Sequence, residues 1–96
     1  MAIDGSIVYA SESACDAYGY SPEQITALKI TDLRASHTLR QVSEQMNEAA
    51  HSGVLFETDH VRSDGSVFPV EVSSRRVDMF GGSYLLSIVR DITNRR

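Results

Sequence analysis

Apolar side chains in the second half of the chain recur at every second position, which is the spacing of β-strands. Residues 54–62 and 67–77 alternate in this way, whereas the run 84–89 is apolar at both sets of positions. Turns at 63–66 and 78–83, each containing Asp and Gly, separate the three segments. The pattern predicts three antiparallel strands, and it places the last strand in the middle of a sheet with both faces covered.

Residues 36–52 carry the longest helical pattern in the chain. Leu39, Val42, Met46 and Ala49 recur at i, i+3, i+7 and i+10, and Gly53 follows as a stop signal. The sequence therefore predicts one amphipathic helix over residues 36–52.

Shorter helices are predicted upstream of it. Ser11 or Ser13 begins a helix that Gly19 ends. Ser21-Pro22-Glu23-Gln24 has the form of a capping box with proline at the first helical position. A single helical turn is predicted at residues 31–33.

Both ends of the chain suggest elements that extend beyond it. Asp4-Gly5 lies between apolar residues and predicts a hairpin that leads into a strand at residues 7–9. Because only three residues precede this turn, the first strand is expected to be truncated. At the other end, Asp91 and Thr93 are helix-capping residue types, so a linker helix is expected to start there and to be cut off.

Composition excludes several classes of protein. A chain of 96 residues makes one domain, and a net charge of -4 with a pI near 5.2 argues against nucleic-acid binding. The single cysteine, Cys15, excludes an internal disulfide and a cysteine-based metal cluster. The sequence has neither a run long enough to span a membrane nor a signal peptide, so we expect a cytoplasmic domain without membrane contact.

Strands at both ends with helices between them predict an α+β fold, in which an antiparallel sheet carries helices on one face. Four segments in this order resemble the PAS domains of the sensory-box type found in bacterial signal-transduction proteins. They are residues 4–10 (DGSIVYA), 18–25 (YGYSPEQI), 64–72 (DGSVFPVEV) and 89–93 (VRDIT).

The resemblance implies a single PAS sensor domain over residues 1–96, with a five-stranded antiparallel sheet of order 2-1-5-4-3. Short helices and one longer helix would cover one face of this sheet. It further implies a non-catalytic module that binds a small ligand in its core and passes its state to a C-terminal effector domain, such as a histidine kinase or a diguanylate cyclase. The alternative is a ligand-free PAS domain that serves as a dimerisation and relay spacer.

If a ligand binds, inward-facing side chains of the strands and helices should line its pocket, although the same pattern fits an ordinary packed core. The candidates are Tyr18, Leu39, Val42, Met46, Phe56, Thr58, Phe68, Val70, Val72, Leu85, Ser87 and Val89.

Two further sites follow from the last strand. Asp91 and Thr93 are the candidate relay residues, because a carboxylate and a hydroxyl at the strand exit can cap the next helix. Tyr84, Leu86 and Ile88 share the opposite parity, with Val67 and Pro69 expected beside them. A face this apolar predicts a cover, and we expect it to form a homodimer.

The sequence does not identify a cofactor for such a domain. A domain without a cofactor is favoured over one that binds haem or flavin. Haem-binding PAS domains carry an axial histidine on the long helix, so His37 is a candidate ligand, set against a surface or capping histidine. Cys15 raises the possibility of a flavin photoreceptor, but the reactive-cysteine motif of that group is absent, so Cys15 is interpreted as a small core residue. No metal site and no catalytic residues are predicted.

Overall fold

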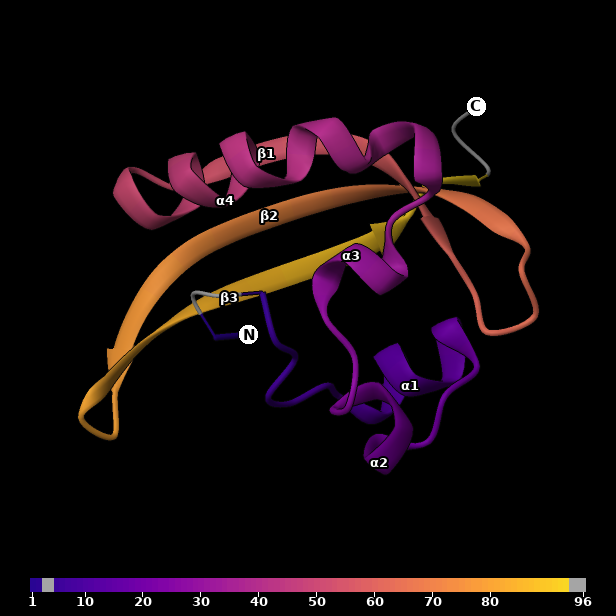
Figure 1. Ribbon diagram of the computed structural model, residues 1–96, viewed down its shortest axis with the longest axis horizontal. Helices are drawn as coiled ribbons and strands as arrows, with labels where there is room; N and C mark the ends of the chain where they lie inside the picture. Colours follow the sequence, from indigo (N-terminus) through magenta and orange to yellow (C-terminus); the bar gives the residue numbers. More distant parts are fainter. Residues whose placement is uncertain (3–4, 94–96) are drawn as a thin grey trace.

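Helices occupy the first half of the chain and strands the second, as the periodicity predicts (Figure 1). The computed structural model describes residues 1–2 and 5–93. Its helices are α1 (Glu12–Tyr18), α2 (Pro22–Ile25), α3 (Ile30–Leu33), the 3-10 helix η1 (Ser36–Gln41) and α4 (Val42–His51). Its strands are β1 (Val54–Val61), β2 (Val67–Met79) and β3 (Gly82–Asp91).

The short helices begin and end at the capping residues that the sequence indicates. The Ser11 side chain accepts a hydrogen bond from the Ala14 amide and caps α1. Gly19 ends α1 at φ 79°, a left-handed conformation that glycine adopts without strain. The Ser21 side chain and the Gln24 side chain each bond the other's backbone amide, which completes the predicted capping box of α2.

The long helix predicted over residues 36–52 is instead two helices in series. Its first part, η1, is a 3-10 helix, in which the Thr38 amide bonds the Ala35 carbonyl three residues back. Three residues per turn rather than 3.6 rotate the side chains out of the phase of α4. Leu39 consequently faces outward and is 42 % exposed, whereas Val42, the first residue of α4, is buried.

The sheet is antiparallel with the order β1-β2-β3. His60 pairs with Phe68 across the first hairpin, and Val72 pairs with Val89 across the second. Pro69 is compatible with this pairing. Its carbonyl accepts a hydrogen bond from the Ile92 amide, so its backbone nitrogen, which carries no hydrogen, faces the same side of β2, beyond the end of β3.

The prediction that both faces of the closing strand are covered is wrong for the described residues, and its mid-sheet position is not established by them. There, β3 is the last of three strands, and its second neighbour is limited to Met1 and Ala2, which pair with Leu85 and Tyr84. Nothing in the described chain covers its outer face, so Ile88 is 67 % exposed. The five-stranded order is therefore not established by this structure.

The strand predicted at residues 7–9 is also wrong, because residues 7–10 have no regular structure. Ser6 makes an isolated bridge to Lys29, and the Ile7 amide donates to the Leu28 carbonyl. The turn predicted at Asp4-Gly5 lies partly outside the described residues; on either side of it, the Ala2 amide bonds the Ser6 carbonyl. The backbone of this segment thus bonds the α2–α3 connection rather than a strand; the Ile7 side chain is buried, whereas Val8 and Tyr9 are exposed.

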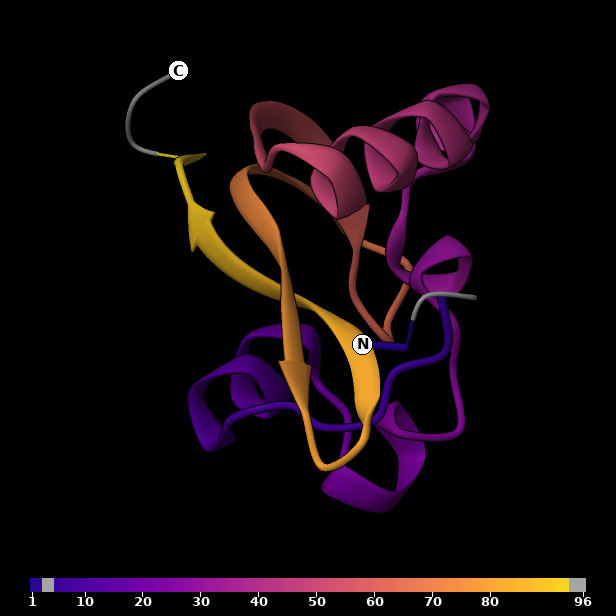
Figure 2. The same cartoon turned by 90° about the vertical axis from the view of Figure 1, so that its left-hand side faces the viewer.

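The core lies between the helices and the inner face of the sheet (Figure 2). Alternate β2 residues Phe68, Val70, Val72 and Ser74 all point inward and are buried. Around them pack Ile7, Cys15, Tyr18, Ile25 and Leu33 from the first half of the chain. This alternation fixes the register of β2, since a slip by one residue would expose the whole inward set. None of the described helices is long and apolar enough to cross a bilayer.

Candidate functional site

A cavity of about 30 Å³ lies between α4 and the inner face of the sheet. Apolar side chains form most of its wall, among them Met46 of α4, Phe56 of β1 and Leu85 of β3. This volume holds about two water molecules. Pockets for drug-sized ligands run to about 300 Å³ or more, so a haem or flavin does not fit this arrangement of the walls.

Polar side chains enter the same wall at a few points. Ser74 and Ser87 share a hydrogen bond of 2.6 Å between their hydroxyl oxygens. Gln45 contributes a buried Oε1 atom that has no hydrogen-bond partner among the described residues. His60 and Arg34, both almost fully buried, complete the polar part of the lining.

His60 connects the cavity to the helical half of the chain. Its Nδ1 atom lies 2.5 Å from the hydroxyl oxygen of Tyr18 on α1. Burial raises the pKa of Tyr18, so its hydroxyl stays protonated, and the tautomer of His60 decides which of the two groups donates. Burial also lowers the pKa of His60 to about 4, with the positive charge of Arg34 adding to the effect and Asp59 partly offsetting it. The histidine is therefore neutral at physiological pH, and the Tyr18 and Phe68 rings pack against it.

The base of the β1–β2 hairpin holds the end of α1. The Ser63 amide donates to the Tyr18 carbonyl at 2.8 Å, and the Ser63 hydroxyl donates to the Gly19 carbonyl at 2.8 Å. Arg62 Nε donates to the Ala17 carbonyl at 3.1 Å. Three successive carbonyls of the helix end, which have no partners within the helix, are thus bonded to two adjacent hairpin residues.

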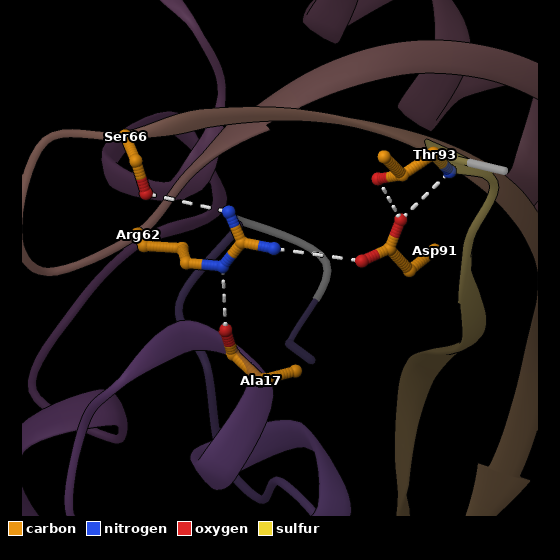
Figure 3. Close-up of polar contacts among 5 residues, drawn as sticks. All are labelled: Ala17, Arg62, Ser66, Asp91 and Thr93. Carbon is orange, nitrogen blue, oxygen red and sulfur yellow. Dashed lines mark hydrogen bonds and ion pairs between the residues drawn. The ribbon is translucent and has the colours of Figure 1, made fainter. Parts of the chain in front are cut away.

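Arg62 also reaches the exit of β3 (Figure 3). Its Nη2 atom lies 3.4 Å from Asp91 Oδ2, its Nη1 atom donates to Ser66 Oγ, and its guanidinium lies 3.9 Å from the centre of the Phe68 ring. Asp91 Oδ1 accepts bonds from both the amide and the hydroxyl of Thr93. These two bonds, with a smaller contribution from Arg62, hold the pKa of Asp91 below its ordinary value.

The outer face of the sheet carries exposed apolar side chains. The pairing register places Leu55, Ser73 and Ile88 in one row across the three strands, with Arg75 beside Leu86 in the next. Leu55 and Ile88 are each 67 % exposed, and Leu86 is 43 % exposed. Val67 and Pro69, expected beside this patch, lie instead at the far end of the sheet, where β2 extends past Asp91.

The structure divides the twelve predicted pocket residues into two groups. Seven of them line the cavity: Val42, Met46, Phe56, Val72, Leu85, Ser87 and Val89. Four others are buried in the core away from its wall: Tyr18, Thr58, Phe68 and Val70. The last, Leu39, lines an open groove on the outer side of α4. Whether a ligand occupies the cavity stays a prediction.

His37, the candidate haem ligand, does not line the cavity. Its side chain is 64 % exposed and its Nε2 atom lies 2.9 Å from Asp59 Oδ2, so it is a surface histidine. Among the described residues, no group of three His, Cys, Asp or Glu side chains has an arrangement that could hold a metal ion.

Sequence reasoning placed one further residue that matters here and missed two. His60 shares the parity of Phe56 and Thr58, which predicts that it points toward the core side, and the structure buries it there. Arg34 and Arg62 had no such signal, because a charged side chain is expected on the surface unless its neighbours in space are known.

Comparison with known proteins gives this arrangement its family. The family model for the PAS domain matches residues 1–94 of the chain. The chain belongs to the PAS domain family. PAS domains are generally sensory, non-catalytic modules of signal-transduction proteins, and the family that the four sequence segments suggested is confirmed.

Individual relatives agree with this assignment. The chain is 34 % identical over 92 residues to a methyl sulfide methyltransferase-associated sensor of Methanosarcina acetivorans; the match takes in 95 % of the chain but only 9 % of the sensor. It is 26 % identical to the PAS domain of an HTR-like protein from Haloarcula marismortui, with a TM-score of 0.82 over 95 % of the chain and 76 % of that structure. A PAS domain from a two-component sensor histidine kinase, 21 % identical, has the same fold, with a TM-score of 0.76 over 91 % of the chain and 76 % of that structure.

The buried histidine predicts how stability depends on pH. An unfolded histidine titrates near 6.5 and folded His60 near 4, so acid protonates the unfolded chain first and favours unfolding. Stability from this group is complete above pH 6.5 and falls by about 3 kcal/mol as the pH drops to 4. Urea unfolding measured across this range should show the loss in the wild type and should show it much reduced in H60F.

H51Q is the matched control, since His51 is exposed and bonds only the Asn47 carbonyl. An unchanged pH profile in H60F would show that His60 is not buried in the neutral form.

Proposed function

We propose that this PAS domain binds a small ligand in the cavity between α4 and the sheet and relays its state to an effector that follows in the chain. We expect this effector to be a domain such as a histidine kinase or a diguanylate cyclase. The observation that supports the relay is the unbroken series of contacts between cavity and exit. It runs from His60 in the cavity wall through Tyr18 and the end of α1 to Arg62 and Asp91.

Each contact in this series is a hydrogen bond, whose strength depends on the direction between donor and acceptor, so displacement of either residue changes it. A ligand that displaces His60 changes the geometry of a buried hydrogen bond, which tolerates little misalignment. Tyr18 lies in the last turn of α1, beside the carbonyl of Ala17 that Arg62 binds. Arg62 in turn positions Asp91, whose other oxygen fixes Thr93 at the start of the exit segment. Such a ligand acts only if it binds one of the two arrangements better than the other.

The five-stranded order 2-1-5-4-3 belongs to the same proposal. Ala2 bridges Tyr84 on the side of β3 opposite β2, which is the position that this order gives to the first strand.

A ligand-free PAS spacer that dimerises and relays is the second candidate. It is favoured by the small volume of the cavity, about 30 Å³, and by the apolar outer face of the sheet. In that case the relay would respond to strain from neighbouring domains rather than to a ligand.

The relay predicts an energetic coupling between Tyr18 and Thr93 that passes through Arg62. Y18F removes the hydroxyl that bonds His60 and should shift the NMR resonance of the Thr93 amide. In an R62Q background the shift caused by Y18F should disappear, because the link to Asp91 is gone.

R90Q is the matched control, since Arg90 makes a 2.9 Å ion pair with Glu71 on the same sheet but has no contact with α1. A Y18F shift that is as large in R62Q as in R90Q would refute a relay through Arg62.

Native mass spectrometry and an absorbance scan of freshly purified protein separate the two candidate functions. Ligand sensing predicts a mass adduct that is released on denaturation, and a Soret or flavin band would identify a cofactor. The cavity volume leads us to expect a small colourless adduct. Unliganded mass in every preparation would favour the spacer.

The apolar outer face predicts a homodimer at micromolar concentration. I88D or L86D introduces a charge into the patch formed by Leu55, Leu86 and Ile88, so each should shift sedimentation velocity toward the monomer. V8D is the matched control, because Val8 is 53 % exposed and lies outside the sheet. A wild-type protein that sediments only as a monomer, with both variants equally soluble, would count against this dimer.

A further inference from the structure

The guanidinium of Arg34 is a buried cation in the wall of the cavity. Arg34 is 5 % exposed, and it lies where the chain passes from α3 to η1, beside the outer edge of β1. Its Nε donates to the Thr38 hydroxyl at 3.1 Å and its Nη2 to the Thr38 carbonyl at 3.3 Å. The ring of Phe56 lies 5.5 Å from the guanidinium carbon.

Among the residues that the structure describes, these partners leave the positive charge without a counter-ion. Both acceptors on Thr38 are neutral, and no described carboxylate lies within ion-pair distance of Arg34. A guanidinium carries five N–H donors and does not lose its proton in proteins, so Arg34 keeps its full charge while Thr38 engages Nε and Nη2. A buried charge without a partner is costly, and this cost favours an anion that can enter.

The other polar groups of the cavity suit the same ligand. In the tautomer of neutral His60 in which Nδ1 accepts from the Tyr18 hydroxyl, the ring proton lies on Nε2 and is a further donor. Gln45 brings a buried amide whose oxygen has no partner among the described residues. Rotating this amide by half a turn exchanges oxygen for nitrogen and presents N–H donors at that position.

The remaining wall limits the size and type of the anion. Ile30, Val42, Val72 and Leu85 are apolar, so a highly charged or fully hydrated anion would lose its water without compensation. The volume of about 30 Å³ holds about two water molecules, so an anion of four or five non-hydrogen atoms enters only if Met46, the flexible part of the wall, moves aside.

We propose that the cavity binds a short-chain monocarboxylate, whose carboxylate pairs with the Arg34 guanidinium and whose alkyl end packs against the apolar wall. A planar guanidinium matches the two oxygens of a carboxylate, which makes this pairing stronger than that with a spherical anion. The inference rests on the proposed ligand-binding function and names the chemical class of its ligand.

The test is titration of the protein with sodium acetate and sodium propionate at pH 7.5, with sodium chloride at equal ionic strength as the reference. Saturable NMR shifts should appear in the methyl groups of Val72 and Leu85 with either carboxylate and be absent with chloride. R34M should weaken binding about 10- to 100-fold, the usual effect of losing a hydrogen-bonded charge. R34K retains the charge without the planar donors and should fall between the two.

R40M is the matched control, since Arg40 is an exposed arginine of the neighbouring η1 and should leave the affinity unchanged. Far-UV circular dichroism establishes that each variant is folded before it is titrated, and R34K carries the test if R34M does not fold. Absence of saturable carboxylate binding by the wild type, or equal affinities in wild type, R34K and R34M, would overturn the proposal.

Failure of this inference can be told apart from failure of ligand sensing itself. A mass adduct that persists in R34M would retain a ligand-binding PAS domain and overturn the carboxylate assignment. Absence of any adduct together with absence of carboxylate binding would overturn both.

Discussion

The hydrogen bond between Tyr18 and His60 is the contact on which the rest of the structure depends. It joins the helical half of the chain to the inner face of the sheet at a point that water does not reach. A buried polar group is costly unless it has a partner, so each of these two residues requires the other in place. The bond thereby sets the position of α1 against β1 more narrowly than apolar packing alone would.

Arg62 extends this constraint to the end of the domain. One side chain meets a helix end, the hairpin turn, an aromatic ring of the core and the carboxylate at the exit of β3. Because the guanidinium is rigid and planar, moving one of its partners changes the geometry offered to the others. Exposed ion pairs add little stability, so the main effect of the Arg62–Asp91 pair is to fix the positions of the groups that it joins.

Local chemistry explains which parts of the fold the sequence predicted. Ser21, Gly19 and the Asp64-Gly65 turn act through neighbours in the chain, and all appear where expected. The alternation along β1 and β2 likewise gave the correct inner face. Two predictions that failed, the strand in segment 7–10 and the covered outer face of β3, depend on partners distant in sequence. The third, the phase of η1, failed because the residue pattern does not distinguish a 3-10 helix from an α-helix.

The candidate site divides in the same way. Parity placed Phe56, Val72 and Leu85 around the cavity, because an inward direction follows from strand geometry. It did not place Arg34 or Arg62, since the environment of a charged side chain is set by contacts between elements far apart in the chain. The positions of these two charged side chains in the site could therefore not be predicted from the sequence, whereas the positions of the apolar residues could.

The burial of Cys15 has a consequence for the chemistry of the whole chain. This is the sole thiol in the sequence, and it lies within the core on α1, next to the turn that bears Tyr18. Oxidants and alkylating agents attack an accessible thiolate, so the sulfur is shielded for as long as α1 stays docked. The folded domain consequently offers no accessible thiol for oxidation or alkylation.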